Sequence, residues 1–147
     1  AAIAISETEQ RIAVLLFDDG VQVISSFELN QLASLTFHEA QVVTSSLDMT
    51  EKILDQLETI QKQPAQYSPL SVHKSLVVTK HILLFGSQKV VPGITQQLGR
   101  HIARLCEYNT VLLAQEQAGA WMLRLKGGAV DKGGPVRKIA TEICGFL

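Results

Sequence analysis

The stretch SPLSVHKSLVVTKHILLFGSQKVV, residues 68–91, decides the fold. Ser68 followed by Pro69 is typical of a helix start, because the serine oxygen can accept from a free amide and proline fits the first helical position. Residues 75–85 taken alone could form a buried strand, since many are β-branched. The length of the pattern and the capping signal favour a helix that Gly86-Ser87 ends. We expect its inner face to hold Val72, Leu76, Thr79 and Leu83, and its opposite face His73, Lys74, Lys80 and His81.

The N-terminal segment has two interpretations. Ser6 and Glu9 have the spacing of a capping box, which predicts a helix from Ser6 to about Phe17. Apolar residues also flank Asp19-Gly20 on both sides, so the same segment could form a β-hairpin. Both alternatives stay open on the pattern of residues alone.

Two more helices are expected before residue 68. One should be capped by Ser25 or Ser26 and end near His38, because its apolar residues recur at spacings of three and four. The other should begin near Asp48 or Thr50 and end before Pro64. Its buried stripe is expected to consist of Met49, Ile53, Leu57 and Ile60.

Two helices are also expected after residue 91. The first follows Pro92-Gly93 and the second opens at Pro135, while residues 110–134 read as a long connection with one helical turn. The first should bury Ile94, Leu98, Ile102 and Leu105 and expose Arg100, His101 and Arg104. The second should bury Val136, Ile139, Ala140, Ile143, Cys144 and Leu147.

Length and composition indicate one globular domain. The 147 residues are about the size of a single ordinary domain, and aromatic residues make up only 5%, so the core must be mostly aliphatic. No apolar run approaches the roughly 20 residues that span a bilayer, and the first residues lack the pattern of a signal peptide. We therefore expect a cytosolic, non-transmembrane protein in which Cys106 and Cys144 act as small apolar residues of a reducing compartment.

The sequence contains no recognisable motif for catalysis or cofactor binding. The four histidines are scattered, without the spacing of a zinc site. Gly127-Gly128 and Gly133-Gly134 lack the residues that would complete a phosphate-binding loop. Cys106 and His101 are too far apart along a helix to form a dyad. We expect no enzyme activity, no cofactor, no metal and no nucleic-acid partner.

Charge is distributed unevenly along the chain. Residues 1–60 carry ten acidic side chains against two basic ones, whereas residues 61–147 carry eleven basic against four acidic. The two halves could simply attract each other when they pack. The alternative is that the basic half faces an anionic partner.

Residues 26–37, 72–91 and 131–140 form three motifs that, in this order along the chain, resemble the ENTH domain of epsin-type vesicle adaptors, within the wider ENTH/ANTH/VHS group. The strongest covers residues 72–91, and the second, residues 131–140, has the family's pattern of Asp131, Gly133, Val136 and Arg137. The third covers residues 26–37. The resemblance spans about residues 7–147 and implies one domain, residues 1–147, of a longer protein. It implies an all-α, right-handed superhelix of about seven or eight helices, and favours a helix over the hairpin.

The resemblance implies a role in membrane trafficking, such as clathrin-dependent endocytosis, in the cytoplasm at vesicle, Golgi, endosome or plasma membranes. Our first hypothesis is an adaptor domain that binds coat, adaptor or cargo-tail proteins. The alternative is a peripheral module that binds phosphoinositide or another anionic phospholipid through its basic half. The first six residues lack the basic residues of an epsin-like lipid-inserting helix, and Lys74 is the position that clearly matches the family's basic pattern. Candidate lipid contacts are Lys74, His73, Arg11 and Lys62. Candidates for a basic or partner-binding surface are Lys80, Lys89, Arg100, Arg104 and Trp121, although Trp121 could instead fill the core.

Overall fold

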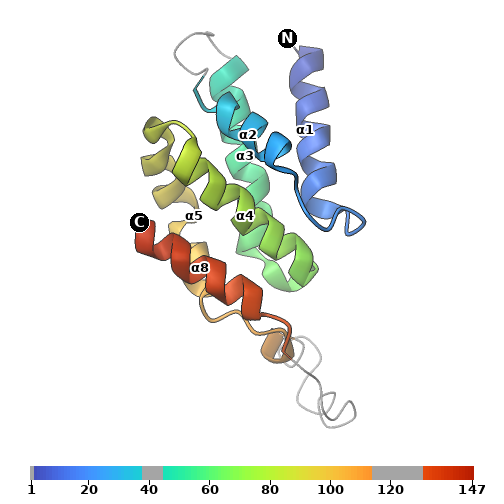
Figure 1. The fold of residues 1–147 in the computed structure, drawn as a ribbon, viewed down its shortest axis with the longest axis vertical. Helices are drawn as coiled ribbons and strands as arrows, with labels where there is room; N and C mark the ends of the chain where they lie inside the picture. Colours follow the sequence, from blue (N-terminus) through green and yellow to red (C-terminus); the bar gives the residue numbers. More distant parts are fainter. Residues whose placement is uncertain (1, 38–44, 114–130) are drawn as a thin grey trace.

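The computed structural model describes residues 2–37, 45–113 and 131–147, and the side chains of residues 10–37, 50–113 and 131–147. Its elements are α1 (Ala2–Phe17), α2 (Ser26–Leu35), α3 (Ser45–Lys62), the 3-10 helix η2 (Pro64–Gln66), α4 (Pro69–Phe85), η3 (Gln88–Val90), α5 (Val91–Leu105) and α8 (Gly134–Phe146). A further helical turn begins at Thr110. Every regular element in these ranges is helical, so the predicted all-α class is confirmed (Figure 1).

Helices α3 and α4 lie in the middle of the molecule (Figure 1). α1 and α2 pack against them on one side, and α5 and α8 pack against them on the other. α4 and α8 run in the same direction, and Lys80 of α4 forms an ion pair with Glu142 of α8.

One aliphatic core joins all of these helices. The predicted stripes are confirmed for Ile53, Leu57 and Ile60 in α3 and for Ile94, Leu98, Ile102 and Leu105 in α5. They are also confirmed for Val136, Ile139, Ala140 and Ile143 in α8. Cys144 is only half-buried and Leu147 is exposed, so the predicted stripe of α8 extends too far at its C-terminal end.

The helix predicted over residues 69–85 is confirmed as α4, and the strand alternative is wrong. Ser68 Oγ accepts from the Ser71 amide at 3.1 Å. At the other end, a Cβ on Gly86 would lie 2.6 Å from the carbonyl oxygen of Ile82, which leaves no space for a side chain. The Ser87 amide donates to Thr36 Oγ1 at 2.8 Å, and this bond joins the end of α4 to the end of α2.

The hairpin alternative around Asp19-Gly20 is also wrong. Asp18 closes a turn, accepting from the Val21 amide at 3.0 Å through its carbonyl and from the Gly20 amide at 2.8 Å through its carboxylate. This turn follows α1, which begins at Ala2, so the predicted start at Ser6 lies inside the helix. The short polar side chain of Asp18 stops α1 by bonding to its own neighbours.

The ends of the next two helices also differ from prediction. Ser25 caps α2 as expected, with its Oγ accepting from the Glu28 amide at 3.2 Å. The helix ends at Leu35, before the predicted His38, because Thr36 Oγ1 turns back to the carbonyl of Ala33 at 2.6 Å. α3 begins at Ser45, earlier than the capping residues near Asp48 suggested.

His101 is buried, contrary to the prediction that it is exposed. Its side chain is only 3% accessible, and its Nε2 lies 3.2 Å from Glu58 Oε2 of α3. The reason is that α5 packs on α3 across this face, and Glu58 supplies a polar partner that lets a histidine enter the contact. The pKa of Glu58 is lowered, first by a hydrogen bond from Gln97 and then by His101.

Candidate functional site

Lys74, the candidate lipid contact with the clearest motif match, is not on the surface. The residue is 2% exposed, and its Nζ donates to the carbonyl oxygens of Asp18 at 2.9 Å and Val21 at 2.7 Å. Next to it, Ser68 Oγ donates to Asp19 Oδ1 at 2.7 Å. We call these contacts the Lys74 latch. The predicted exposure of Lys74 is wrong because the connection between α1 and α2 folds over the start of α4.

Three other predicted cationic positions are engaged by neighbouring helices. Arg11 is exposed but forms an ion pair with Glu28 of α2. Lys80 Nζ lies 2.6 Å from Glu142 Oε2 of α8, and this bond lowers the pKa of Glu142. His73 is half-buried beside α8 in a depression of about 460 Å³, and burial lowers its pKa. These residues face different neighbours and do not form one basic surface.

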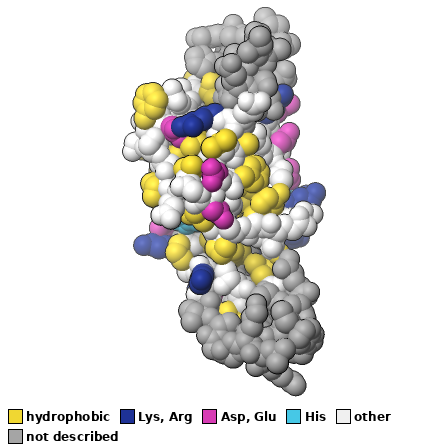
Figure 2. Space-filling model, turned by 90° about the vertical axis from the view of Figure 1, so that its right-hand side faces the viewer, with side chains coloured by type: hydrophobic (Ala, Val, Ile, Leu, Met, Phe, Trp, Pro, Cys, Tyr) yellow, Lys and Arg dark blue, Asp and Glu magenta, His cyan; other side chains and the backbone are white. Residues whose placement is uncertain are grey.

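The remaining predicted residues divide into two groups. Lys89 and Arg100 are exposed on α5 or just before it, whereas Lys62 and Arg104 are exposed and line one shared pocket. Trp121 lies outside the described residues. On the face that Figure 2 shows, Lys and Arg side chains are separated from one another, with acidic and apolar side chains between them. The pocket is therefore the place where two predicted cations meet.

This pocket lies where α3 and α5 end, and we call it the α3–α5 pocket. Its volume is about 560 Å³. α3 and η2 contribute Gln61, Lys62 and Pro64, the end of α5 and its following turn contribute Arg104, Leu105, Glu107, Tyr108 and Asn109, and the next helical turn contributes Leu112 and Leu113. A cavity of this size is in the range of ligand-binding sites.

The turn after α5 builds one wall of the pocket. The amides of Glu107 and Tyr108 donate to carbonyls three residues earlier, at 3.0 and 3.1 Å, which tightens the chain as the helix ends. Asn109 then caps the next helical turn, because its Oδ1 accepts from the amides of Val111 at 2.9 Å and Leu112 at 3.1 Å. These amides are already satisfied, so the pocket offers its side chains and not a free helix N-terminus.

The pocket combines an apolar wall with a charged edge. Leu112 is 53% exposed although it is apolar, and Leu113 is only partly buried beside it. The charged side chains are Lys62, Arg104 and Glu107, all exposed, with a net charge of one positive unit. This arrangement suits a ligand that carries both an apolar group and a negative charge.

Gln61 lies at the inner side of the pocket and carries a buried oxygen without a partner among the described residues. The residue is 2% exposed, and its Nε2 donates to Thr79 Oγ1 at 3.1 Å and to Ser75 Oγ at 3.4 Å. Its Oε1 is buried, and the described part of the chain provides no hydrogen-bond partner for it. Such an atom is uncommon in a folded protein and marks a place where a donor would be stabilised.

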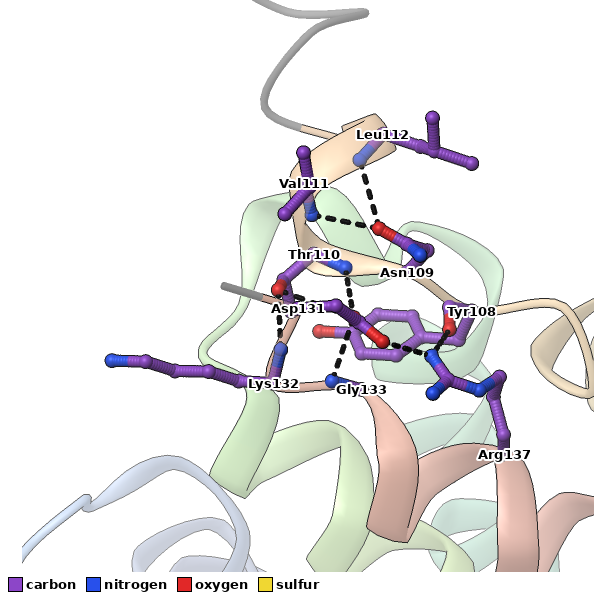
Figure 3. A network of polar contacts seen from close by, with 9 residues as sticks. All are labelled: Tyr108, Asn109, Thr110, Val111, Leu112, Asp131, Lys132, Gly133 and Arg137. Atoms are coloured by element: carbon purple, nitrogen blue, oxygen red, sulfur yellow. Dashed lines mark hydrogen bonds and ion pairs between the residues drawn. The ribbon is translucent and has the colours of Figure 1, made fainter. Parts of the chain in front are cut away.

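A polar network holds the turn after α5 against the start of α8 (Figure 3). Asp131 Oδ1 accepts from the amides of Thr110 and Gly133, each at 2.9 Å, and its Oδ2 forms an ion pair with Arg137. Arg137 also donates to the carbonyl of Tyr108 at 2.8 Å. Because Tyr108 lines the pocket, the network fixes one wall of the α3–α5 pocket.

The network changes the pKa values of Asp131 and Tyr108. The amide of Thr110, then Arg137 and the amide of Gly133, lower the pKa of Asp131 from 3.8 to about 2. Burial, with a smaller effect of Asp131, raises the pKa of Tyr108. A Cβ on Gly133 would lie 2.8 Å from both Cδ1 and the carbonyl oxygen of Tyr108, so only glycine fits there.

Sequence reasoning did not identify the wall of this pocket as a site. Tyr108, Leu112 and Leu113 carry no motif of their own, and the pocket depends on contacts between distant segments. The available signal is the pattern of Asp131, Gly133 and Arg137, which forms part of the resemblance to the ENTH domain. The structure gives this pattern a physical role in positioning Tyr108.

In the described ranges, no group of three or more His, Cys, Asp or Glu side chains is placed to hold a metal ion. None of the helices in these ranges has the length and apolarity required to cross a membrane. Comparison of the chain with models of protein families, with curated proteins and with solved structures finds no match to any of the three.

Proposed function

We propose that this chain is an ENTH-like adaptor domain of membrane trafficking whose α3–α5 pocket binds an acidic segment of a protein partner. The observation that carries the proposal is the meeting of exposed Lys62 and Arg104 at the edge of a partly apolar pocket, while Lys74 is buried. The partner class is coat, adaptor or cargo-tail proteins. The domain would act without catalysis.

The chemistry of the pocket supports a peptide ligand. Exposed cations attract acidic side chains and steer their approach, and the apolar wall near Leu112 can cover an aliphatic side chain. An inorganic anion would use the cations alone.

The ENTH resemblance extends the proposal to the fold and the location. The proposed arrangement is a right-handed superhelix of seven or eight helices, in which each helix packs on helices near it in sequence. The proposed location is the cytoplasm, peripheral to trafficking membranes. The three ordered sequence motifs support both statements, and the helical packing of α1 to α5 and α8 is compatible with the proposed superhelix.

The experiment measures binding of labelled peptides by fluorescence anisotropy. The peptides cover cytoplasmic tails of trafficking cargo and linker segments of coat and adaptor proteins. We expect binding by those that place acidic residues beside an aliphatic one, and a loss of about tenfold or more in the double variant Lys62→Glu, Arg104→Glu. The matched control, Lys89→Glu with Arg100→Glu, has the same change in charge outside the pocket and should bind like the wild type.

Sedimentation with liposomes tests the alternative. If liposomes containing phosphoinositide bind the chain in a salt-sensitive way and no peptide does, the membrane hypothesis replaces ours. If peptides bind but both double variants lose affinity equally, the pocket is not the site and general charge attraction explains the binding.

A further inference from the structure

Cys106 and Cys144 lie in contact although 38 residues separate them in the sequence. Cys106 directly follows α5 and Cys144 lies in the last turn of α8, and their Sγ atoms are 3.6 Å apart. Both cysteines are free thiols and both are half-buried, so neither is fully shielded from solvent. Their sequence neighbours Leu105 and Ile143 are fully buried in the core and hold the two sulfur atoms in place.

We propose that Cys106 and Cys144 are an intramolecular oxidation site, at which a two-electron oxidant such as hydrogen peroxide links α5 to α8 by a reversible disulfide. A disulfide bond is about 2.0 Å long, so the sulfur atoms must approach by roughly 1.5 Å. Rotation of the two side chains is a natural way to achieve this. The inference does not depend on the proposed function, because it concerns only the two thiols.

A metal site is a poorer explanation for this pair. Structural zinc sites use four ligands, usually cysteine and histidine. In the described residues no third His, Cys, Asp or Glu side chain completes such a group. The two thiols are therefore placed for reaction with each other.

The chemistry divides into two balanced steps. The sulfur of Cys106 attacks one oxygen of the peroxide; an S–O bond forms, the O–O bond breaks, and hydroxide leaves and takes the thiol proton as water. The sulfur of Cys144 then attacks the sulfenic sulfur; the S–S bond forms, the S–O bond breaks, and the hydroxide leaves with the Cys144 proton as a second water. The thiols lose two electrons and two protons, and one peroxide becomes two waters.

The environment of Cys144 favours one order of the two steps. Burial, and then the hydrogen bond with Cys106, raise the pKa of Cys144 to about 11. Cys144 therefore stays protonated at neutral pH and is a poor first nucleophile, since the thiolate is the reactive form. We assign the first reaction to Cys106 and the closing reaction to Cys144 as the order to be tested; the disulfide itself rests on the 3.6 Å contact and not on this order.

The test compares the folded chain with the unfolded chain. Reduced protein is equilibrated with a series of reduced and oxidised glutathione ratios, with and without denaturant, and then alkylated; the products are identified by intact mass and peptide mapping. We expect the folded chain to form the Cys106–Cys144 link at a glutathione ratio at least about tenfold more reducing than the denatured chain requires, because folding raises the effective concentration of one thiol near the other. The proposal would be overturned if the folded chain still carried two alkylatable thiols at glutathione ratios where the denatured chain has already formed the disulfide.

Single variants test the order of reaction without relying on the link itself. With peroxide and a sulfenic-acid trap, Cys144→Ser should accumulate trapped product at residue 106, whereas Cys106→Ser should give much less at residue 144. The opposite result would overturn the assignment. Circular dichroism of both variants shows whether the helices remain intact, and Cys144→Ala repeats the measurement if the serine variant does not fold.

Discussion

The Lys74 latch and the α3–α5 pocket both place cations beside the ends of helices, but with opposite outcomes. In the latch, the connection after α1 covers Lys74, and main-chain carbonyls of Asp18 and Val21 accept from its ammonium group. In the pocket, Lys62 and Arg104 remain exposed at the last turns of α3 and α5. The first cation stabilises the fold, while the other two are accessible to a partner.

This difference shows why a matching basic residue does not by itself identify a lipid site. Lys74 occupies the position that matches the family pattern, yet the chain that precedes α2 has folded over it. A lysine with its ammonium group donating to two carbonyls is a structural element. Changes at each region should therefore separate stability from binding.

The largest effect is expected for Lys74→Met. Methionine keeps the length of the apolar stem but removes both hydrogen bonds, so the Val21 carbonyl loses the ammonium donor and the Asp18 carbonyl keeps only the Val21 amide. We expect the free energy of unfolding to fall by about 2–4 kcal/mol, measured by urea denaturation. The matched control Lys89→Met changes an exposed lysine and should stay within about 0.5 kcal/mol of the wild type. Equal stability of the two variants would show that the latch contributes nothing.

The second-largest effect on stability is expected for Gly133→Ala, which changes the wall of the pocket. The added methyl group would meet Tyr108 at 2.8 Å, so the turn after α5 must move away from α8. We expect a loss of about 1–3 kcal/mol in thermal or urea denaturation. Gly145→Ala is the control, because a Cβ there has no atom within 4 Å; it should be neutral or slightly stabilising in the last turn of α8. A neutral Gly133→Ala would mean that the close approach to Tyr108 is not required.

The third prediction uses the pH dependence of Asp131. Its pKa is about 2 in the folded chain, compared with an ordinary value of 3.8, so its contribution to stability is complete above about pH 4. As the pH falls from 4 towards 2, the unfolded state takes up the proton first, and this contribution is lost. Asp131→Asn should therefore be less stable than the wild type near pH 7 and should show a shallower decrease between pH 4 and 2. Parallel curves for the two proteins across this window would contradict the role of Asp131.

Much of the fold could be predicted from the sequence because its signals are local. The spacing of Ile94, Leu98, Ile102 and Leu105 predicted the buried stripe of α5 correctly, and the Ser68-Pro69 cap predicted the start of α4. The ends of helices were less predictable. α2 stops at Leu35 because Thr36 bonds back to Ala33 and also to Ser87, and that second contact joins residues far apart in the sequence.

The site was harder to predict because it depends on packing between distant segments. Lys62 and Arg104 were both named as candidates, but nothing in their local sequence indicates that they share a pocket. Lys74 and His101 were both expected on the surface, because helical periodicity places polar residues on the outer face. Each is buried since another segment supplies its partners: carbonyls from the connection after α1 for Lys74, and Glu58 of α3 for His101.

The smallest effect is expected for Arg104→Gln, and it distinguishes a free cation from a structural one. Arg104 lies in the last turn of α5, where a positive charge interacts favourably with the negative end of the helix dipole. We expect a loss of about 0.3–1 kcal/mol in the free energy of unfolding at low ionic strength, and a smaller loss in 1 M salt because exposed charges are screened. Lys74→Met should instead keep most of its effect in 1 M salt, since its hydrogen bonds are buried. If Arg104→Gln destabilised the chain by as much as Lys74→Met in both salt conditions, Arg104 would be part of the fold and unavailable to a ligand.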